Sequence, residues 1–319
     1  MKQHVVVYKS LPADLLEQLT SEFNVTSFGG INAGNRTQFL AALGTAHGMI
    51  GASLPITSDM LDAAPLLKIA STISVGVDNF DLEYFRKRGL MLAHTPGVLN
   101  EATADAIFAL ILASARRIVE LAELVKAGKW TGSIGESLFG VNVHGKTLGM
   151  LGMGRIGSAV ARRAHHGFGM KIIYHNTRPN PEAEKELAAT YVSREELFRQ
   201  ADVVCPMLPL TPQTERTIGA HEFSLMKRSA IFINASRGKI VDETALIDAL
   251  QQKTIYGAGL DVFEKEPLPA DSPLLQLPNV VALPHIGSAT HDTRRAMAEL
   301  AVQNLIDGLR GAQPKHLAV

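Results

Sequence analysis

The chain has 319 residues, of which 46% are hydrophobic and 19% are charged. This length is about twice that of a typical domain, and the apolar content is too high for a disordered chain, so we expect two globular domains. Lysine plus arginine and aspartate plus glutamate each number 31, which gives a formal net charge of zero. A neutral chain offers no general positive field to a polyanion. Nucleic-acid binding is therefore disfavoured, and a small substrate is favoured.

The sequence lacks the signals of membrane and secreted proteins. Its longest apolar stretch, residues 106–115, is far shorter than the roughly 20 residues of a membrane-spanning helix. The first residues turn polar at Lys9 and Ser10, before a signal-peptide core is complete. The single cysteine, Cys205, can form no internal disulfide, and its apolar surroundings favour packing over a nucleophilic role. We therefore expect a cytoplasmic protein that crosses no membrane.

Short apolar runs alternate with helical segments up to residue 99. Residues 12–23 and 36–43 have helical spacing. The expected strands are residues 4–8, 25–28, 48–51, 68–72 and 90–93. This alternation is typical of a parallel sheet covered by helices, so the fold class is α/β.

A longer helix is expected next. Asn100 can cap it, and its apolar positions continue to a stop at Gly128, which is a length of roughly 25 residues and suits a connection between two domains. Residues 131–145 are rich in glycine and serine and predict a loop.

The strand and helix alternation resumes at Lys146. The expected strands are residues 147–151, 171–174, 202–207, 230–234, 257–260 and 280–283. Six strands in one open sheet are typical of a dinucleotide-binding domain. A final helix is expected at residues 292–309, ending at Gly311.

The strongest local motif is a glycine-rich turn directly after residues 147–151. Gly152, Gly154 and Gly157 have the G-x-G-x-x-G spacing, and a helical pattern follows them. The first glycine permits a tight turn, the second lets the backbone approach a pyrophosphate, and the third lets the helix pack closely on the strand. The free N–H groups of the helix N-terminus then favour phosphate binding.

The end of the second strand of this sheet bears on the choice of cofactor. NAD-binding domains place a carboxylate there for the ribose 2′-hydroxyl. Here the strand ends in Asn176, Thr177 and Arg178, which can donate to a 2′-phosphate. NADP is therefore favoured, and NAD is retained as a second cofactor. The alternative is an ordinary turn in which Arg178 is solvated.

Polar groups follow three of the expected strands in the last third of the chain. Arg237 follows residues 230–234, Glu264 and Glu266 follow residues 257–260, and His285 follows residues 280–283. Ligands of open α/β sheets bind at the carboxyl ends of strands. An arginine for an anionic substrate, a histidine as proton donor and a carboxylate to orient it suit the reduction of a 2-keto acid. This scheme requires no metal, and no H-E-x-x-H or C-x-x-C spacing occurs.

The chain resembles the D-isomer-specific 2-hydroxyacid dehydrogenases over essentially its whole length. The matching segments are residues 74–78, 151–157, 232–238, 257–267 and 284–290. The resemblance implies a Rossmann-type doubly wound parallel sheet inserted into a smaller flavodoxin-like α/β substrate domain. The implied dinucleotide-binding domain is residues 100–288. The substrate domain is then residues 1–99, completed by residues 289–319 with the C-terminal helix.

The resemblance also implies a catalytic set. Arg237, Glu266 and His285 are its members, with His285 as the general acid in reduction. Spacing alone leaves Glu264 and Glu266 open, and the family motif selects Glu266, which precedes Pro267.

The implied binding residues lie in both domains. Val75 and Gly76 are expected to bind the substrate carboxylate through their backbone N–H groups, together with Arg237 and His285, and Asp261 is expected to face the nicotinamide amide. Besides the glycine turn and residues 176–178, the implied cofactor contacts are Thr103, Arg155, Ile156, Leu208, Pro209, Thr214, Ala235, Ser236 and Asp261.

The expected function is NADPH-dependent reduction of glyoxylate, hydroxypyruvate or 2-ketogluconate to a D-2-hydroxy acid by a homodimer. The related animal hydroxypyruvate reductases donate a second tryptophan across the dimer to the neighbouring active site, and the chain has Ser133 at that position. This less crowded site keeps the larger 2-ketogluconate among the candidates. A dinucleotide-sensing corepressor of the same fold is the alternative from another class.

Overall fold

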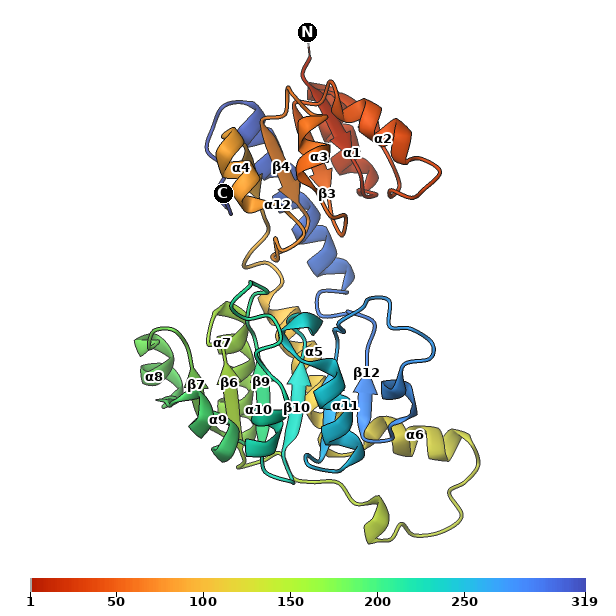
Figure 1. Ribbon diagram of the computed structural model, residues 1–319, viewed down its shortest axis with the longest axis vertical. Coiled ribbons are helices and arrows are strands. Elements are labelled where there is room, and N and C mark those ends of the chain that lie inside the picture. Colours follow the sequence, from red (N-terminus) through yellow and green to blue (C-terminus); the bar gives the residue numbers. More distant parts are fainter. Residues whose placement is uncertain (1) are drawn as a thin grey trace. The chain divides into compact units, whose positions relative to one another are not determined.

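The computed structural model describes residues 2–319, which form two compact units. One unit contains the chain up to Leu99 together with Ala289–Val319, and the other contains Asn100–Ser288. Each unit has one sheet covered by helices (Figure 1). The chain thus leaves its first unit once and returns to it at the end.

The sheet of the first unit has the strand order β2-β1-β3-β4-β5, and all its strand pairs are parallel. This is the flavodoxin-like order. The strands are β1 His4–Val7, β2 Asn24–Ser27, β3 Gly48–Gly51, β4 Ile69–Thr72 and β5 Met91–Ala93. The helices are α1 Ala13–Glu22, α2 Arg36–Leu43, α3 Ser58–Asp62, α4 Leu82–Arg88 and α12 His291–Leu309. The five expected strands are all present.

Helix α12 joins the end of the chain to the first sheet, where it packs against β3, β4 and β5. A Cβ at Gly308 would lie only 2.4 Å from Cδ1 of Ile69, so the lack of a side chain lets the helix approach β4 closely. The buried Ser71 hydroxyl donates to the Ala301 carbonyl of the helix at 2.8 Å. The second half of α12 is therefore part of the core of the first unit.

The sheet of the second unit has the order β12-β11-β10-β9-β6-β7-β8, again with parallel pairs. Its first six strands in chain order have the Rossmann arrangement, with the switch point between β6 and β9. The strands are β6 Thr147–Leu151, β7 Lys171–His175, β8 Thr190–Tyr191, β9 Val203–Pro206, β10 Ile231–Asn234, β11 Gly257–Leu260 and β12 Val280–Ala282. The prediction of an α/β fold with a Rossmann-type sheet is confirmed.

Helices and short turns connect these strands. The α-helices are α5 Asn100–Ala115, α6 Ile118–Lys126, α7 Arg155–Arg162, α8 Pro181–Leu187, α9 Arg194–Gln200, α10 Ala220–Leu225 and α11 Glu243–Gln251. Short 3-10 turns occupy η1 Glu136–Leu138, η3 Gly238–Ile240 and η4 Pro273–Gln276, and one π-helical turn occupies η2 Arg163–Gly167. Within residues 2–319, no helix is both long and apolar enough to cross a membrane.

The prediction of six strands in this sheet was wrong, because β8 adds a seventh. Thr190 and Tyr191 form a two-residue strand at the sheet edge, paired with β7, and both residues are exposed. Such a short and solvated strand needs no apolar run, so the pattern of the sequence contains no sign of it.

The prediction of one long helix from Asn100 to Gly128 was also wrong. The chain forms two helices, because Arg117 has a left-handed backbone with φ of 53°. The carbonyl of Ala115 accepts the N–H of Val141 at 2.8 Å, which replaces the helical bond. The Arg117 guanidinium binds both carboxylate oxygens of Glu120, at 2.6 and 2.8 Å. A contact from distant residues thus ends the helix.

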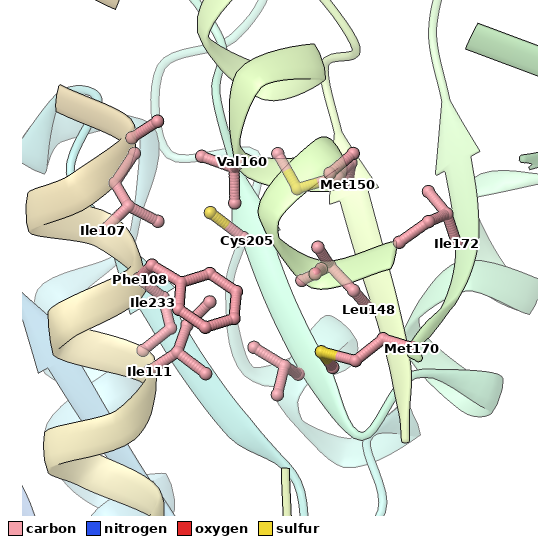
Figure 2. Close-up of a cluster of buried hydrophobic side chains, with 14 of the residues drawn as sticks. Ile107, Phe108, Ile111, Leu148, Met150, Val160, Met170, Ile172, Cys205 and Ile233 are labelled. Atoms are coloured by element: carbon pink, nitrogen blue, oxygen red, sulfur yellow. The ribbon is translucent and has the colours of Figure 1, made fainter. Parts of the chain in front are cut away.

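The core between α5 and the second sheet contains Cys205. Figure 2 shows its side chain, from β9, among apolar side chains of α5, β6 and α7. Cys205 is fully buried, and burial raises the pKa of its thiol to about 12. A thiol held in this form is a packing group, because the reactive species of cysteine is the thiolate.

Candidate active site

The glycine turn connects β6 to α7 at the carboxyl end of the sheet. Gly152 has a left-handed φ of 103°, and a Cβ there would lie 2.5 Å from the Met207 carbonyl oxygen. A Cβ at Gly157 would lie 2.3 Å from the Gly152 carbonyl oxygen. A Cβ at Gly154, in contrast, would meet no atom within 4 Å beyond its chain neighbours. The backbone at Gly154 is therefore open, beside the first N–H groups of α7, as a phosphate-binding turn requires.

The residues after β7 lie beside this turn. The Asn176 side-chain oxygen accepts the N–H of Met153 at 2.6 Å, so Asn176 supports the turn directly. Thr177 and Arg178 are exposed, and Arg178 has no hydrogen bond or ion pair within residues 2–319. No carboxylate occupies residues 176–178. The arrangement therefore leaves the guanidinium of Arg178 accessible after β7.

The loop after β9 contains Leu208, Pro209 and Thr214. The Thr214 hydroxyl donates to the Pro209 carbonyl at 2.6 Å and accepts the N–H of Thr211 at 2.8 Å. Thr214 therefore closes this loop on itself, and Leu208 and Pro209 begin the loop directly beside the switch point.

The loop that contains Arg237 is organised by Asn234 at the end of β10. The buried Asn234 carboxamide accepts the N–H and the hydroxyl of Ser236, at 3.1 and 3.0 Å, and donates to the Arg237 carbonyl at 3.0 Å. The guanidinium of Arg237 donates to the Ser236 carbonyl at 2.7 Å. The sequence-based prediction did not assign Asn234, although an asparagine before a loop is a known turn signal.

The Arg237 loop touches the loop after β11 directly through backbone atoms. A Cβ at Gly238 would lie 1.9 Å from both the carbonyl carbon and the oxygen of Phe263, and 2.4 Å from the Glu264 nitrogen. Only glycine allows this approach. The loops that contain Arg237 and Glu266 are therefore in direct contact.

Glu266 and His285 form a pair at the ends of β11 and β12. The His285 Nδ1 lies 2.7 Å from Oε2 of Glu266, and the other carboxylate oxygen accepts the N–H of Phe263 at 3.1 Å. His285 has a left-handed backbone with φ of 56°, and half of its side chain is exposed. The second imidazole nitrogen is thus available for a proton transfer.

The charges of this site favour a protonated imidazole. The hydrogen bond to Glu266 is the main cause of a raised pKa for His285, and the carboxylate of Asp261 adds to it, against burial and the charge of Arg237. Burial raises the pKa of Glu266, but the hydrogen bonds from His285 and Phe263 outweigh it, so the net shift is downward. The pair therefore holds its proton on His285 at a higher pH than an isolated histidine.

Asp261 supports the chain beyond His285. Its two carboxylate oxygens accept the N–H groups of Ile286 at 2.7 Å and Gly287 at 2.8 Å. Asp261 is buried, and burial is the main reason why its pKa is raised. A Cβ at Gly287 would lie 3.2 Å from the Thr103 side chain, so Thr103 of α5 belongs to the same neighbourhood.

Val75 and Gly76 belong to the first unit, in the loop after β4. The Val75 carbonyl accepts from His94 Nδ1 at 2.9 Å, and the Gly76 carbonyl accepts the Ser74 hydroxyl at 2.7 Å. The N–H groups of Val75 and Gly76 have no acceptor within the described part of the chain. Two free donors beside fixed carbonyls suit a carboxylate. Nothing in the sequence pattern singled out His94.

Comparison with known proteins decides the family. A family model described as "D-isomer specific 2-hydroxyacid dehydrogenase, NAD binding domain" matches residues 108–287. The chain is 56% identical over 311 residues to the glyoxylate/hydroxypyruvate reductase B of Yersinia pestis (strain Pestoides F), covering 98% of this chain and 95% of that protein. The chain belongs to the D-isomer-specific 2-hydroxyacid dehydrogenases.

Solved structures agree with this family. The TT0316 protein of Thermus thermophilus aligns with a TM-score of 0.91 and 44% identity, covering 99% of this chain and 100% of that chain. An NADPH-dependent glyoxylate/hydroxypyruvate reductase of Sinorhizobium meliloti, in complex with NADP and malonate, aligns with a TM-score of 0.87 and 31% identity. That alignment covers 100% of this chain and 97% of that chain.

Two alanine substitutions in the glycine turn should differ in their effects on stability and on NADPH affinity. Gly154→Ala places a methyl group in open space, so the free energy of unfolding should change by less than about 0.5 kcal/mol, while the affinity for NADPH should fall. Gly157→Ala forces a methyl group onto the Gly152 carbonyl and should cost about 1–3 kcal/mol even without a cofactor. Denaturant unfolding and fluorescence titration with NADPH measure both effects. Equal NADPH affinity in Gly154→Ala and the wild type would show that the space is not a pyrophosphate site.

The substitution Glu266→Gln should lower the pKa of His285, because the neutral amide no longer stabilises the imidazolium. NMR titration of the His285 ring protons measures this. The raised pKa of His285 in the folded state contributes stability that is complete below its unfolded pKa of about 6.5 and is lost as pH rises through the folded pKa. This part of the pH dependence of unfolding should disappear in Glu266→Gln. An unchanged His285 titration contradicts the pairing.

Proposed function

We propose that the protein reduces a small 2-keto acid, such as glyoxylate or hydroxypyruvate, to its D-2-hydroxy acid with NADPH. The observation that carries the proposal is the Glu266–His285 pair at 2.7 Å, in the same unit as the glycine turn and Arg237. The printed names of the relatives from Yersinia and Sinorhizobium support this substrate class. We assign dinucleotide binding to Asn100–Ser288, which also contains Arg237 and His285, and binding of the substrate carboxylate to the other unit.

The roles of the catalytic residues follow from their chemistry. Bound NADPH supplies a hydride to the carbonyl carbon of the substrate. His285 donates a proton to the carbonyl oxygen from the nitrogen that does not face Glu266. Glu266 fixes the tautomer and stabilises the imidazolium before the transfer, and Arg237 binds and polarises the anionic substrate. In the direction of oxidation, the neutral His285 accepts the same proton.

The substrate carboxylate is assigned to the N–H groups of Val75 and Gly76. Both groups lack an acceptor within residues 2–319, and their carbonyls are held by His94 and Ser74. A carboxylate accepts several N–H donors at once, so this loop binds it without a charged side chain.

The preference for NADPH is assigned to Asn176, Thr177 and Arg178. Support comes from the accessible guanidinium of Arg178, from the lack of a carboxylate in this segment and from the NADP in the Sinorhizobium structure. The other proposed contacts of the cofactor are Thr103, Gly152, Gly154, Arg155, Ile156, Gly157, Leu208, Pro209, Thr214, Ala235, Ser236 and Asp261.

The decisive measurement is kcat/KM for glyoxylate, hydroxypyruvate, pyruvate and 2-ketogluconate, each with NADPH and with NADH. We expect turnover of at least one of the first two substrates and a higher kcat/KM with NADPH. Ser133 is exposed and has a small side chain, so 2-ketogluconate is included as the largest substrate. His285→Ala should lower kcat by about 10²–10⁴-fold and leave the affinity for NADPH nearly unchanged.

Arg178→Ala serves as the control for the cofactor assignment. It should raise KM for NADPH and leave KM for NADH unchanged, because only NADPH has the 2′-phosphate. Absence of turnover with every substrate of the panel would refute the proposed reductase activity and favour the corepressor-like alternative. Full activity of His285→Ala would refute the mechanism but not the substrate class.

We also propose that two copies of the chain associate through the segment from Ile118 to Phe139, called here the arm. Figure 1 shows α6 and the chain after it extending away from the sheet of their own unit. The large apolar side chains of the arm that remain exposed are Ile118, Val119, Val125, Trp130, Ile134 and Phe139. Exposed apolar side chains gathered on one segment are typical of an interface.

Sedimentation equilibrium tests the arm. The wild type should sediment as a dimer at micromolar concentration, and Ile118→Asp should shift the equilibrium toward the monomer, because a charge then replaces a buried interface group. Leu66→Asp is the matched control, since Leu66 is about as exposed, at 50% against 51% for Ile118, but lies outside the arm. A monomeric wild type would refute the proposal.

A further inference from the structure

Arg216 has an unusual backbone at the end of the loop that follows β9. Its φ is 51°, in the left-handed region that residues with a Cβ seldom adopt. The side chain is about half exposed. Such a strained conformation is stable only when surrounding contacts compensate for the strain. The contacts of Arg216 therefore indicate its structural role.

Arg216 binds three groups on two other segments. Its guanidinium contacts the carboxylate of Asp242 at 2.9 Å and that of Glu264 at 3.2 Å, through different nitrogens. Its backbone N–H donates to the Lys239 carbonyl at 2.8 Å. Lys239 and Asp242 belong to the segment that continues from Arg237, and Glu264 belongs to the loop of Glu266.

The two segments that Arg216 joins are those that touch at Gly238. The backbone of Phe263 and Glu264 lies directly on Gly238, with no side chain between them. On the same loop, the Glu264 N–H donates to the carboxylate of Glu243 at 3.0 Å. Arg216 therefore binds the same two segments that meet at this backbone contact.

We propose that Arg216 is a positioning residue, which holds the Arg237 loop and the Glu266 loop together and so keeps the carboxylate of Glu266 on His285. The inference rests on the proposed function, because it assigns Arg216 a part in the same reaction. Arg216 acts through Glu264, which is two residues from Glu266, and is not itself a catalytic residue.

Arginine is suited to this role for a geometric reason. Its planar fork presents nitrogens in different directions, so one side chain can bind Asp242 and Glu264 together. The ammonium of a lysine is a single point charge and replaces only part of this arrangement. Both ion pairs are partly exposed, so their contribution is modest and should decrease with added salt.

The expected consequence is a change in the proton affinity of His285. The charged groups that act on His285 are Glu266 and Asp261, which favour the imidazolium, and Arg237, which opposes it. If the Glu266 loop becomes more mobile, the interaction of Glu266 with His285 weakens, and His285 releases its proton at a lower pH. A loss of general stability alone would leave this titration unchanged.

The test compares Arg216→Gly with Lys253→Gly. Both residues have a left-handed backbone, with φ of 51° and 55°, so glycine relieves the same strain in each. Lys253 lies between α11 and β11 and has no ion pair within the described residues, so its variant controls for the backbone effect. The variants Arg216→Lys and Glu264→Gln are added because each removes only part of the contacts of Arg216 with Asp242 and Glu264.

The first measurement is NMR titration of His285, assigned by its absence in His285→Gln. We expect the midpoint to move to lower pH in Arg216→Gly, less in Arg216→Lys and Glu264→Gln, and not in Lys253→Gly. The second measurement is kcat for reduction, which should fall by about two- to tenfold in Arg216→Gly, with its high-pH limit displaced in the same direction as the titration. In the double variant Arg216→Gly with Glu264→Gln, the titration midpoint and kcat should differ little from those of Arg216→Gly alone.

The inference is overturned if the His285 titration is the same in Arg216→Gly and the wild type, or if Lys253→Gly shifts it equally. It is also overturned if kcat falls in Arg216→Gly while the pH profile keeps its position. The NMR titration needs no turnover, so a wild type that reduces no 2-keto acid would refute the proposed function and leave the effect of Arg216 on His285 measurable.

Discussion

The parallel direction of the strands in the second sheet determines where the functional groups lie. All strands of this sheet end at one edge, so segments far apart in sequence meet there. Gly152 follows β6, Asn234 ends β10 and His285 follows β12, so the site is assembled from residues that are widely separated along the chain. No single segment contains the site. The sheet therefore brings these residues together, although no short sequence motif contains them all.

The zero formal net charge conceals a local separation of roles. Carboxylates of the second unit are used as internal supports: Asp261 holds the backbone after His285, and Glu266 holds His285 itself. Arg178 is accessible at the same edge of the sheet, toward the proposed anionic cofactor. These carboxylates thus act within the protein, whereas the Arg178 side chain is exposed to solvent. The overall balance says nothing of this arrangement.

Local sequence patterns predicted the buried strands correctly. They failed where a contact with a distant segment determines the structure. The apolar runs placed both sheets, but the break at Arg117 depends on the Ala115 carbonyl, which a later segment of the chain captures through the N–H of Val141. At the site, spacing could not choose between the glutamates of the loop after β11. The structure places Glu266 on His285 and Glu264 on an arginine. Such a choice depends on the turn of the loop in three dimensions, which residue spacing does not describe.

The contact at Gly238 has a consequence for how this protein can change in evolution. No amino acid with a Cβ fits at this position unless the backbone at Phe263 moves, and that backbone also supplies an N–H to Glu266. A lineage that altered position 238 would have to rebuild a second loop in the same step. The conformations of the two loops that meet at Gly238 therefore depend on each other, and a change in one loop requires a matching change in the other.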